Sequence, residues 1–141
     1  MKLRFFTFHF SLFISLSGSL LALLLLISCS SKTDADRAQD VLVESLTAFY
    51  GGDIDAYISH SDFGTDLSAG KDSLMRLVLQ RYVDEVQQRG GLKEVEPIHA
   101  EQQDDSTILV NYALRFNDGS REMCIKQMRR RDGEWRMCVG E

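Results

Sequence analysis

No catalytic motif is apparent in this 141-residue chain, although several of its side chains are of types that take part in catalysis. An imidazole and phenols could act as general acids or bases at His99, Tyr57 and Tyr112. The chain contains no HExxH metal pair, no GxSxG nucleophile and no phosphate-binding glycine loop. A folded core uses the same residue types, so we expect Tyr57, Tyr112 and the single tryptophan, Trp135, in the core or in a pocket wall. We expect His99 to be an exposed strand residue, and we predict no catalytic residue, no metal site and no cofactor.

The first cysteine has a different chemistry, because it follows a secretory pattern. A short basic start at Lys2 and Arg4 precedes an apolar run over residues 12–27, which is typical of a signal peptide. The run ends in Leu-Ile-Ser-Cys at residues 26–29, which resembles the lipobox of bacterial lipoproteins. That resemblance implies cleavage after residue 28 and acylation of Cys29, and several acyl chains together give lasting membrane attachment.

An uncleaved anchor is the alternative, because residues 5–27 are almost long enough to span a bilayer. The lipoprotein interpretation predicts a signal peptide at residues 1–28, and a lipidated cysteine with a short polar tether at residues 29–35. Ser30 follows the cysteine, and the sorting rule of such lipoproteins then implies the outer membrane. We therefore expect a protein of the bacterial cell envelope that is attached to the membrane through its N-terminal lipid.

The charge of the mature chain argues against nucleic acid as a partner. Without Lys2 and Arg4, 14 of the 16 basic residues remain against 21 acidic ones, a net charge of −7. An acidic domain is a poor match for nucleic acid or for an anionic lipid surface. The one basic run, Arg129-Arg130-Arg131, precedes a turn, so we expect it to be a solvated strand end. Residues 36–141 have the length of one domain.

Helical spacing dominates the first half of this domain. Apolar residues form one stripe from residue 36 onward, and Thr33 or Asp34 can cap the helix that Gly51-Gly52 ends. The stripe consists of Ala38, Val41, Leu42, Leu46 and Phe49. Asp53 can cap a short second helix. A third helix is predicted over residues 72–89, with an apolar face so wide that we expect it to be covered on more than one side.

The second half alternates with the period of strands. We predict strands over residues 92–100, 106–116, 121–131 and 134–140. Pro97 in the first of them predicts an edge or a bulge. Asn-Asp-Gly-Ser at residues 117–120 and Asp-Gly at residues 132–133 are hairpin signals. Helices followed by an antiparallel meander predict an α+β domain, with the helices packed on a curved four-stranded antiparallel sheet.

The remaining cysteines, Cys124 and Cys138, test the strand register. A two-residue loop at residues 132–133 places Cys138 opposite Gln127, which points Cys124 to the other face and forbids a disulfide. The apolar residues of the third strand raise a second conflict. Pairing of residue 117 with residue 120 puts Met123 on the face of Tyr112, whereas the second hairpin puts Met128 on the face of Trp135 and Met137. In a regular strand Met123 and Met128 lie on opposite faces, so both sets cannot face the same core. One bulge between residues 125 and 128 would remove both conflicts and place the two cysteines diagonally on one face. A disulfide and two small buried thiols therefore both stay open.

The order of the segments AFYGGDIDAYIS, GGLKEVE and RRDGEWRM resembles small envelope lipoproteins of unknown function. Their fold is cystatin-like and belongs to the nuclear-transport-factor-two-like group, also described as SnoaL-like or ketosteroid-isomerase-like. The likeness covers about residues 35–139. It implies a cone in which the sheet wraps around a long helix. Members use the hollow of the cone as an active site, a ligand pocket or a partner surface, and fold alone does not decide between these uses.

Three functions follow from this resemblance. The expected one is a lipid-anchored, non-catalytic module that binds a small ligand or an envelope protein. The alternative is a small isomerase or dehydratase, because such relatives place an acid or a histidine beside a tyrosine inside the cone; Tyr57, His99 and Tyr112 are then the candidates. The third is a structural lipoprotein that forms a homodimer through an apolar patch on the open face of its sheet.

Overall fold

The computed structural model describes residues 31–63 and 69–139, without the side chains of residues 69–71. The expected signal peptide at residues 1–28 and the expected lipidation site, Cys29, lie outside the described residues. The folded unit is Lys32–Glu141, and every core residue of the described part belongs to it. The core of the described residues therefore lies within this one unit, as expected for a domain that folds by itself.

Helix α2, Asp34–Tyr50, begins where the sequence places its cap. The Thr33 hydroxyl accepts a hydrogen bond from the Asp36 backbone N–H at 3.1 Å, and the Asp36 carboxylate accepts one from the Thr33 backbone N–H at 2.9 Å. This capping box satisfies two backbone donors at the start of the helix. The apolar stripe faces the sheet, and Ala38 and Leu42 are completely buried in it.

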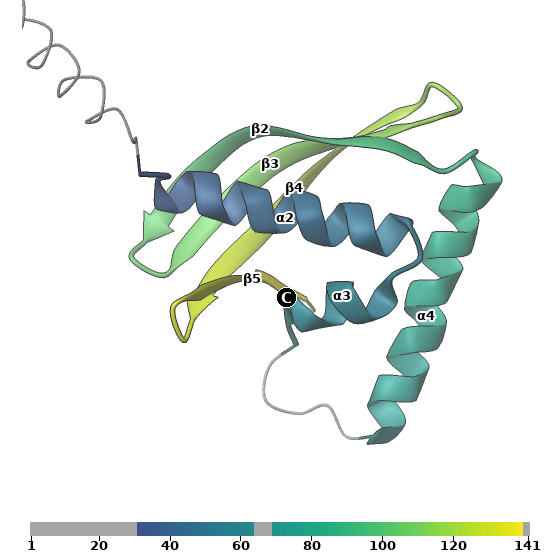
Figure 1. Ribbon diagram of the computed structural model, residues 1–141, viewed down its shortest axis with the longest axis horizontal. Helices are drawn as coiled ribbons and strands as arrows, with labels where there is room; N and C mark the ends of the chain where they lie inside the picture. The colour runs from purple at the N-terminus through teal and green to yellow at the C-terminus, as the bar shows by residue number, and fades with distance from the viewer. Residues whose placement is uncertain (1–30, 64–68, 140–141) are drawn as a thin grey trace, which may run out of the picture. The chain divides into compact units, whose positions relative to one another are not determined.

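Helices α3, Ile54–Ser59, and α4, Ala69–Gln88, follow α2 at its C-terminal end (Figure 1). The Asp53 side chain caps α3 as expected. Leu79, Val83 and Val86 form the buried side of α4. No helix among the described residues is both long and apolar enough to cross a membrane.

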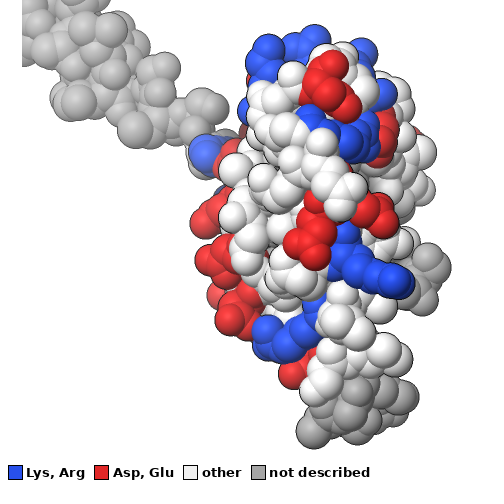
Figure 2. All heavy atoms as spheres, turned by 90° about the vertical axis from the view of Figure 1, so that its right-hand side faces the viewer, with Lys and Arg blue, Asp and Glu red and all other residues white. Residues whose placement is uncertain are grey.

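The expectation that α4 would be covered on more than one side was wrong for the described part of the chain. Leu74 and Leu77 are each 63% exposed, and Tyr82 is 55% exposed. The physical reason is position: α4 lies at the end of the unit and packs against α2 and α3 on one side only. Figure 2 shows the outer face of α4, where uncharged side chains alternate with scattered charges of both signs.

The sheet has five strands in the order β1-β5-β4-β3-β2. They are β1, Ser61–Asp62; β2, Leu92–Asp104; β3, Thr107–Phe116; β4, Arg121–Arg131; and β5, Glu134–Cys138. The four expected strands are present and antiparallel, but the expected sheet was one strand short. β1 pairs in parallel with β5, which makes the sheet mixed. A two-residue strand carries no alternating pattern, so the sequence could not indicate it.

The register between β3 and β4 also corrects an expectation. The Phe116 N–H donates to the Ser120 carbonyl at 3.0 Å, and Gly119 has a φ of +88°, so the loop holds three residues, 117–119, rather than two. This one-residue difference places Cys124 opposite Tyr112 and continues without a break along β4. The bulge expected between residues 125 and 128 is absent from this pairing, because the extra residue lies in the turn.

Strand β2 forms the edge of the sheet and carries irregularities, as Pro97 indicated. The pairing with β3 shifts between Pro97 and His99, so Pro97 pairs with Tyr112 and His99 pairs with Asn111. These two residues of β2 therefore belong to opposite faces of the sheet. Helix α2 lies along the concave face (Figure 1), where Ile108, Val110, Met128 and Met137 pack beneath it.

Candidate functional site

A pocket of about 340 Å³ lies where the three helices meet the sheet. The described residues that line it are Leu46, Phe49 and Tyr50 of α2; Tyr57 of α3; Phe63; Met75, Val78, Leu79 and Tyr82 of α4; Tyr112 of β3; Lys126 of β4; and Val139. Its size is at the lower end of the range of about 300–1,000 Å³ for ligand sites. Most of its wall is apolar or aromatic, and the only charged group among these residues is an ammonium.

Two of the four expected pocket residues line this pocket. Tyr57 enters it from α3, where its ring stacks at 4.5 Å from the ring of Phe49. Tyr112 enters it from the middle of β3. Tyr50, the last residue of α2, joins them although the sequence pattern did not single it out. The three phenols gather because the end of α2, the short α3 and the concave face of β3 converge at one place.

Burial keeps these phenols protonated. It is the main cause that raises the pKa of Tyr50 to about 12, and it also raises the pKa of Tyr57 and of Tyr112. The Cys124 thiol, directly opposite Tyr112 across the β3–β4 pair, adds to the shift at Tyr112. At neutral pH these hydroxyls can donate hydrogen bonds to a ligand, but they are weak acids and do not supply a base.

Lys126 brings a charge into the pocket. In the observed register, Cys124, Lys126 and Met128 share the concave face of β4, so the lysine stem points inward between a thiol and a buried methionine. Its Nζ donates to the Cys138 backbone carbonyl at 3.3 Å. Desolvation is the main cause that lowers the pKa of Lys126. Sequence reasoning missed this residue. Residues two apart in a strand share a face, so Lys126 could have been placed on the concave face once Met128 was known to be buried there.

His99 and Trp135 are not in the pocket. His99 is exposed on β2, on the face opposite to Tyr112, because of the shift after Pro97. Trp135 is buried in the core, with the Arg130 guanidinium 5.6 Å from its ring centroid. The described chain therefore does not bring His99 together with Tyr57 and Tyr112, and the histidine–tyrosine set expected for an isomerase is not assembled.

Cys124 and Cys138 are thiols and are not joined to each other in the described part of the chain. Cys124 shares the concave face with Tyr112. Met137 pairs with Met128 on this same face, so Cys138, the next residue, points to the other face. The disulfide, which depended on a bulge in β4, has no basis in the observed register.

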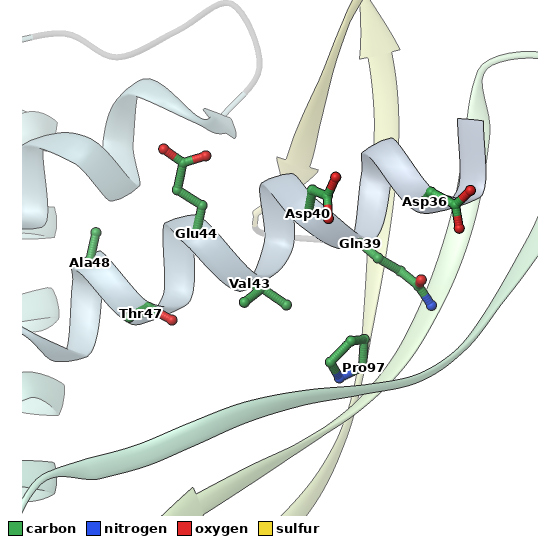
Figure 3. A pocket seen from close by; sticks show the side chains of 8 residues that line it. All are labelled: Asp36, Gln39, Asp40, Val43, Glu44, Thr47, Ala48 and Pro97. Atoms are coloured by element: carbon green, nitrogen blue, oxygen red, sulfur yellow. The ribbon is translucent and has the colours of Figure 1, made fainter. Parts of the chain in front are cut away.

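A larger hollow, of about 740 Å³, lies between α2 and β2 (Figure 3). Val43 and Gln39 point toward Pro97 on β2, whereas the carboxylates of Asp40 and Glu44 point to the other side of the helix. Asp40 pairs with Lys32. The hollow is shallow, and its acidic groups do not converge. No group of three or more His, Cys, Asp or Glu among the described residues has the arrangement of a metal site.

The basic run of β4 is engaged within the fold. Arg130 pairs with Asp34 at 3.2 Å, and Arg131 pairs with the buried Asp62 at 3.0 Å. These contacts join the strand end to the start of α2 and to β1. The run therefore serves the domain itself, in keeping with the expected strand end.

Comparison with known proteins identifies the fold. No family model matches the chain, and no curated protein matches it. A solved structure from Campylobacter jejuni, provisionally described as an NTF2-like transpeptidase, superposes with a TM-score of 0.62 at 15% identity, over 72% of this chain and 97% of that one. A SEC-C motif containing protein from Rhodopseudomonas palustris aligns with a TM-score of 0.45 at 17% identity, over 80% of this chain and 94% of that one. The first likeness shows that this chain has an α+β fold of the NTF2-like type.

Proposed function

From the NTF2-like fold and its pocket, we propose that this chain is a lipid-anchored envelope protein whose folded unit binds a small molecule in the cone without catalysing a reaction. The pocket among α2, α3, α4 and the sheet carries the proposal. It is lined mainly by apolar and aromatic side chains with a few polar groups, which is the usual composition of a ligand site.

Binding is favoured over catalysis by the groups that the pocket lacks. None of the described residues that line it is Asp, Glu or His. The titratable groups on its wall are phenols and one ammonium, and burial raises the pKa of three of the phenols. General acid–base catalysis works best with a pKa near the operating pH, so these phenols are poor catalysts at neutral pH.

A pocket-filling substitution tests the binding proposal. Met75→Trp places an indole in the pocket, whereas Leu74→Trp adds the same ring to a neighbouring α4 position that is 63% exposed. Native mass spectrometry with pooled small apolar compounds would measure binding to each variant. We expect Met75→Trp to abolish the complexes formed by the unmodified unit, and Leu74→Trp to keep them. Equal binding by both variants would contradict a site in this pocket.

The lipid anchor is a separate part of the proposal, supported by the pattern of residues 1–29. Mass spectrometry of the protein from its native membrane should show loss of 28 residues and an acylated Cys29. A Cys29→Ala variant should lose this modification. An intact residue 1 in the membrane fraction would instead support the uncleaved anchor. Recovery in the outer-membrane fraction would agree with the location that Ser30 indicates.

A homodimer is the second candidate, because the convex sheet face exposes apolar side chains. Met123 and Ile125 of β4 are 62% and 66% exposed, and they share this face. Sedimentation velocity of the unit Lys32–Glu141 would detect self-association. If these residues form the contact, Ile125→Lys should shift a dimer to monomer. A dimer that persists in this variant would exclude the face, and a monomer at all concentrations would exclude the dimer.

A further inference from the structure

The Lys126 side chain lies in surroundings that do not balance its charge. It extends from the concave face of β4 into the pocket, beside Cys124 and Met128 and next to Val139. Its Nζ has one protein acceptor among the described residues, the Cys138 carbonyl at 3.3 Å. An ammonium group has three N–H donors, so two of them remain for another partner.

No carboxylate of the described residues forms an ion pair with Lys126, whereas other basic residues of the described chain, such as Arg89, Arg130 and Arg131, pair with Asp or Glu. The titratable groups that act on Lys126 are the thiols of Cys124 and Cys138. A partly buried charge without a counter-ion is costly, and proteins usually pair such groups. The folded unit therefore presents an unbalanced positive group inside an apolar pocket.

The rest of the pocket offers a surface for an apolar body. Val78 and Tyr82 on α4 line it and are 43% and 55% exposed, so apolar wall faces solvent when the pocket is empty. Met75, Leu79 and Phe49 continue this wall toward the core. A molecule that covers the wall gains free energy from burial of apolar area.

We propose that the ligand is a small molecule with an apolar body and one carboxylate, and that Lys126 binds the carboxylate. This inference rests on the proposed binding function and names its ligand class. A charge-assisted hydrogen bond from Nζ would pair the ammonium, and the phenols of Tyr50 and Tyr112 can donate to the same group. A single ammonium matches one negative charge; a phosphate dianion would call for more cationic donors than this pocket provides.

Three probes of equal chain length test the charge requirement: octanoate, 1-octanol and octylammonium. The unit Lys32–Glu141 contains the core of the described residues, and its use avoids detergent, which would compete for the pocket. The readout is the methionine methyl spectrum, because Met75 lines the pocket and Met123 lies on the convex face. We expect octanoate to shift the Met75 signal but not the Met123 signal, at concentrations where the probe is monomeric.

Two lysine variants complete the design. Lys126→Met keeps an apolar stem without the charge, and Lys93→Met removes an exposed lysine from β2 as the control. We expect the unmodified unit and Lys93→Met to prefer octanoate over 1-octanol by about 10-fold or more, since hydrogen bonds to charged groups are strong. Lys126→Met should lose this preference while its affinity for 1-octanol stays the same or rises. A cooperative urea transition confirms that each variant is folded.

Equal affinity for octanoate and 1-octanol, unchanged in Lys126→Met, would overturn the carboxylate proposal while small-molecule binding remained. Tighter binding of octylammonium than of octanoate would also overturn it. If none of the three probes shifts the Met75 signal, the binding function fails, and the carboxylate proposal fails with it.

Discussion

The pocket depends on the phase of β4, that is, on which of its side chains point to the concave face of the sheet. Two methionines on this strand test it. Met128 is completely buried on the concave face, whereas Met123 is 62% exposed on the convex face. The two residues have the same side chain and lie on the same strand, so Met128→Ala and Met123→Ala differ only in the face that they probe. The three-residue loop at residues 117–119 determines which face each one takes.

The expected costs follow from burial. Met128→Ala removes a completely buried side chain from contact with the core and should lower the free energy of unfolding by about 2–5 kcal/mol. Met123→Ala removes mainly solvent-exposed atoms and should change it by no more than about 0.5 kcal/mol. A domain of this type has a total stability of about 5–15 kcal/mol, so the difference is easily measured. Met128→Leu, which nearly conserves volume, should cost less than about 1.5 kcal/mol.

Equilibrium urea unfolding of the unit Lys32–Glu141, followed by circular dichroism, measures these free energies. Equal slopes of free energy against urea concentration in the variants would show that they unfold in comparable transitions. A large cost for Met123→Ala and a small one for Met128→Ala would show that β4 has the opposite phase. Large costs for both would show a bulge between residues 125 and 128, with both methionines inside. The first result would refute the assignment of Lys126 to the pocket.

Four further predictions follow from single contacts. Gly119→Ala forces a side chain into a backbone with a φ of +88° and should destabilise the unit by about 1–2 kcal/mol in the same urea assay; no loss would argue against the three-residue loop. Thr33→Ala removes the capping box and should cost about 0.5–2 kcal/mol, again by urea unfolding, and an unchanged midpoint would show that the cap is dispensable. Burial lowers the pKa of Lys126 in the folded unit. Between this lowered pKa and about 10.5, the unfolded chain therefore binds more protons than the folded one, and the free energy of unfolding rises with pH in that window. Lys126→Met should therefore be more stable than the unmodified unit at pH 7, and this advantage should shrink toward pH 10.5. The tyrosines titrate alike in both proteins and do not affect this comparison. A stability difference between the two proteins that does not change with pH would contradict the burial of Lys126. Alkylation in denaturant without reductant should label both Cys124 and Cys138, whereas a disulfide would protect both.

Local chemistry explains why much of the chain could be predicted from its sequence. The capping box at Thr33, the Asp53 cap and the Asp-Gly turn at residues 132–133 depend on side chains within a few residues of each other. The buried stripe of α2 and the alternation of β3 likewise follow from the period of apolar residues. These features sufficed for the α+β class and for two of the pocket residues, Tyr57 and Tyr112.

The phase of β4 required the tertiary structure, because apolar residues occur on both of its faces. Asn-Asp-Gly-Ser can form a two-residue or a three-residue loop, and the choice reverses every side chain of the strand. Asn117 also donates to the Gly90 carbonyl at 2.8 Å, a contact with the end of α4 that no local pattern contains. The position of Lys126 inside the pocket and the separation of Cys124 from Cys138 both follow from this choice.

The sequence by itself determined the cap at the start of α2, the end of α2 at Gly51 and the turn at residues 132–133, because caps and turns act over a few residues. Only the tertiary structure decided which faces meet. The shift after Pro97 turned His99 away from the pocket, the pairing of β1 with β5 added a strand without a pattern, and the position of α4 at the end of the unit left its outer side exposed. Each of these outcomes depends on contacts between segments far apart in the chain, and the pocket is the place where those segments converge.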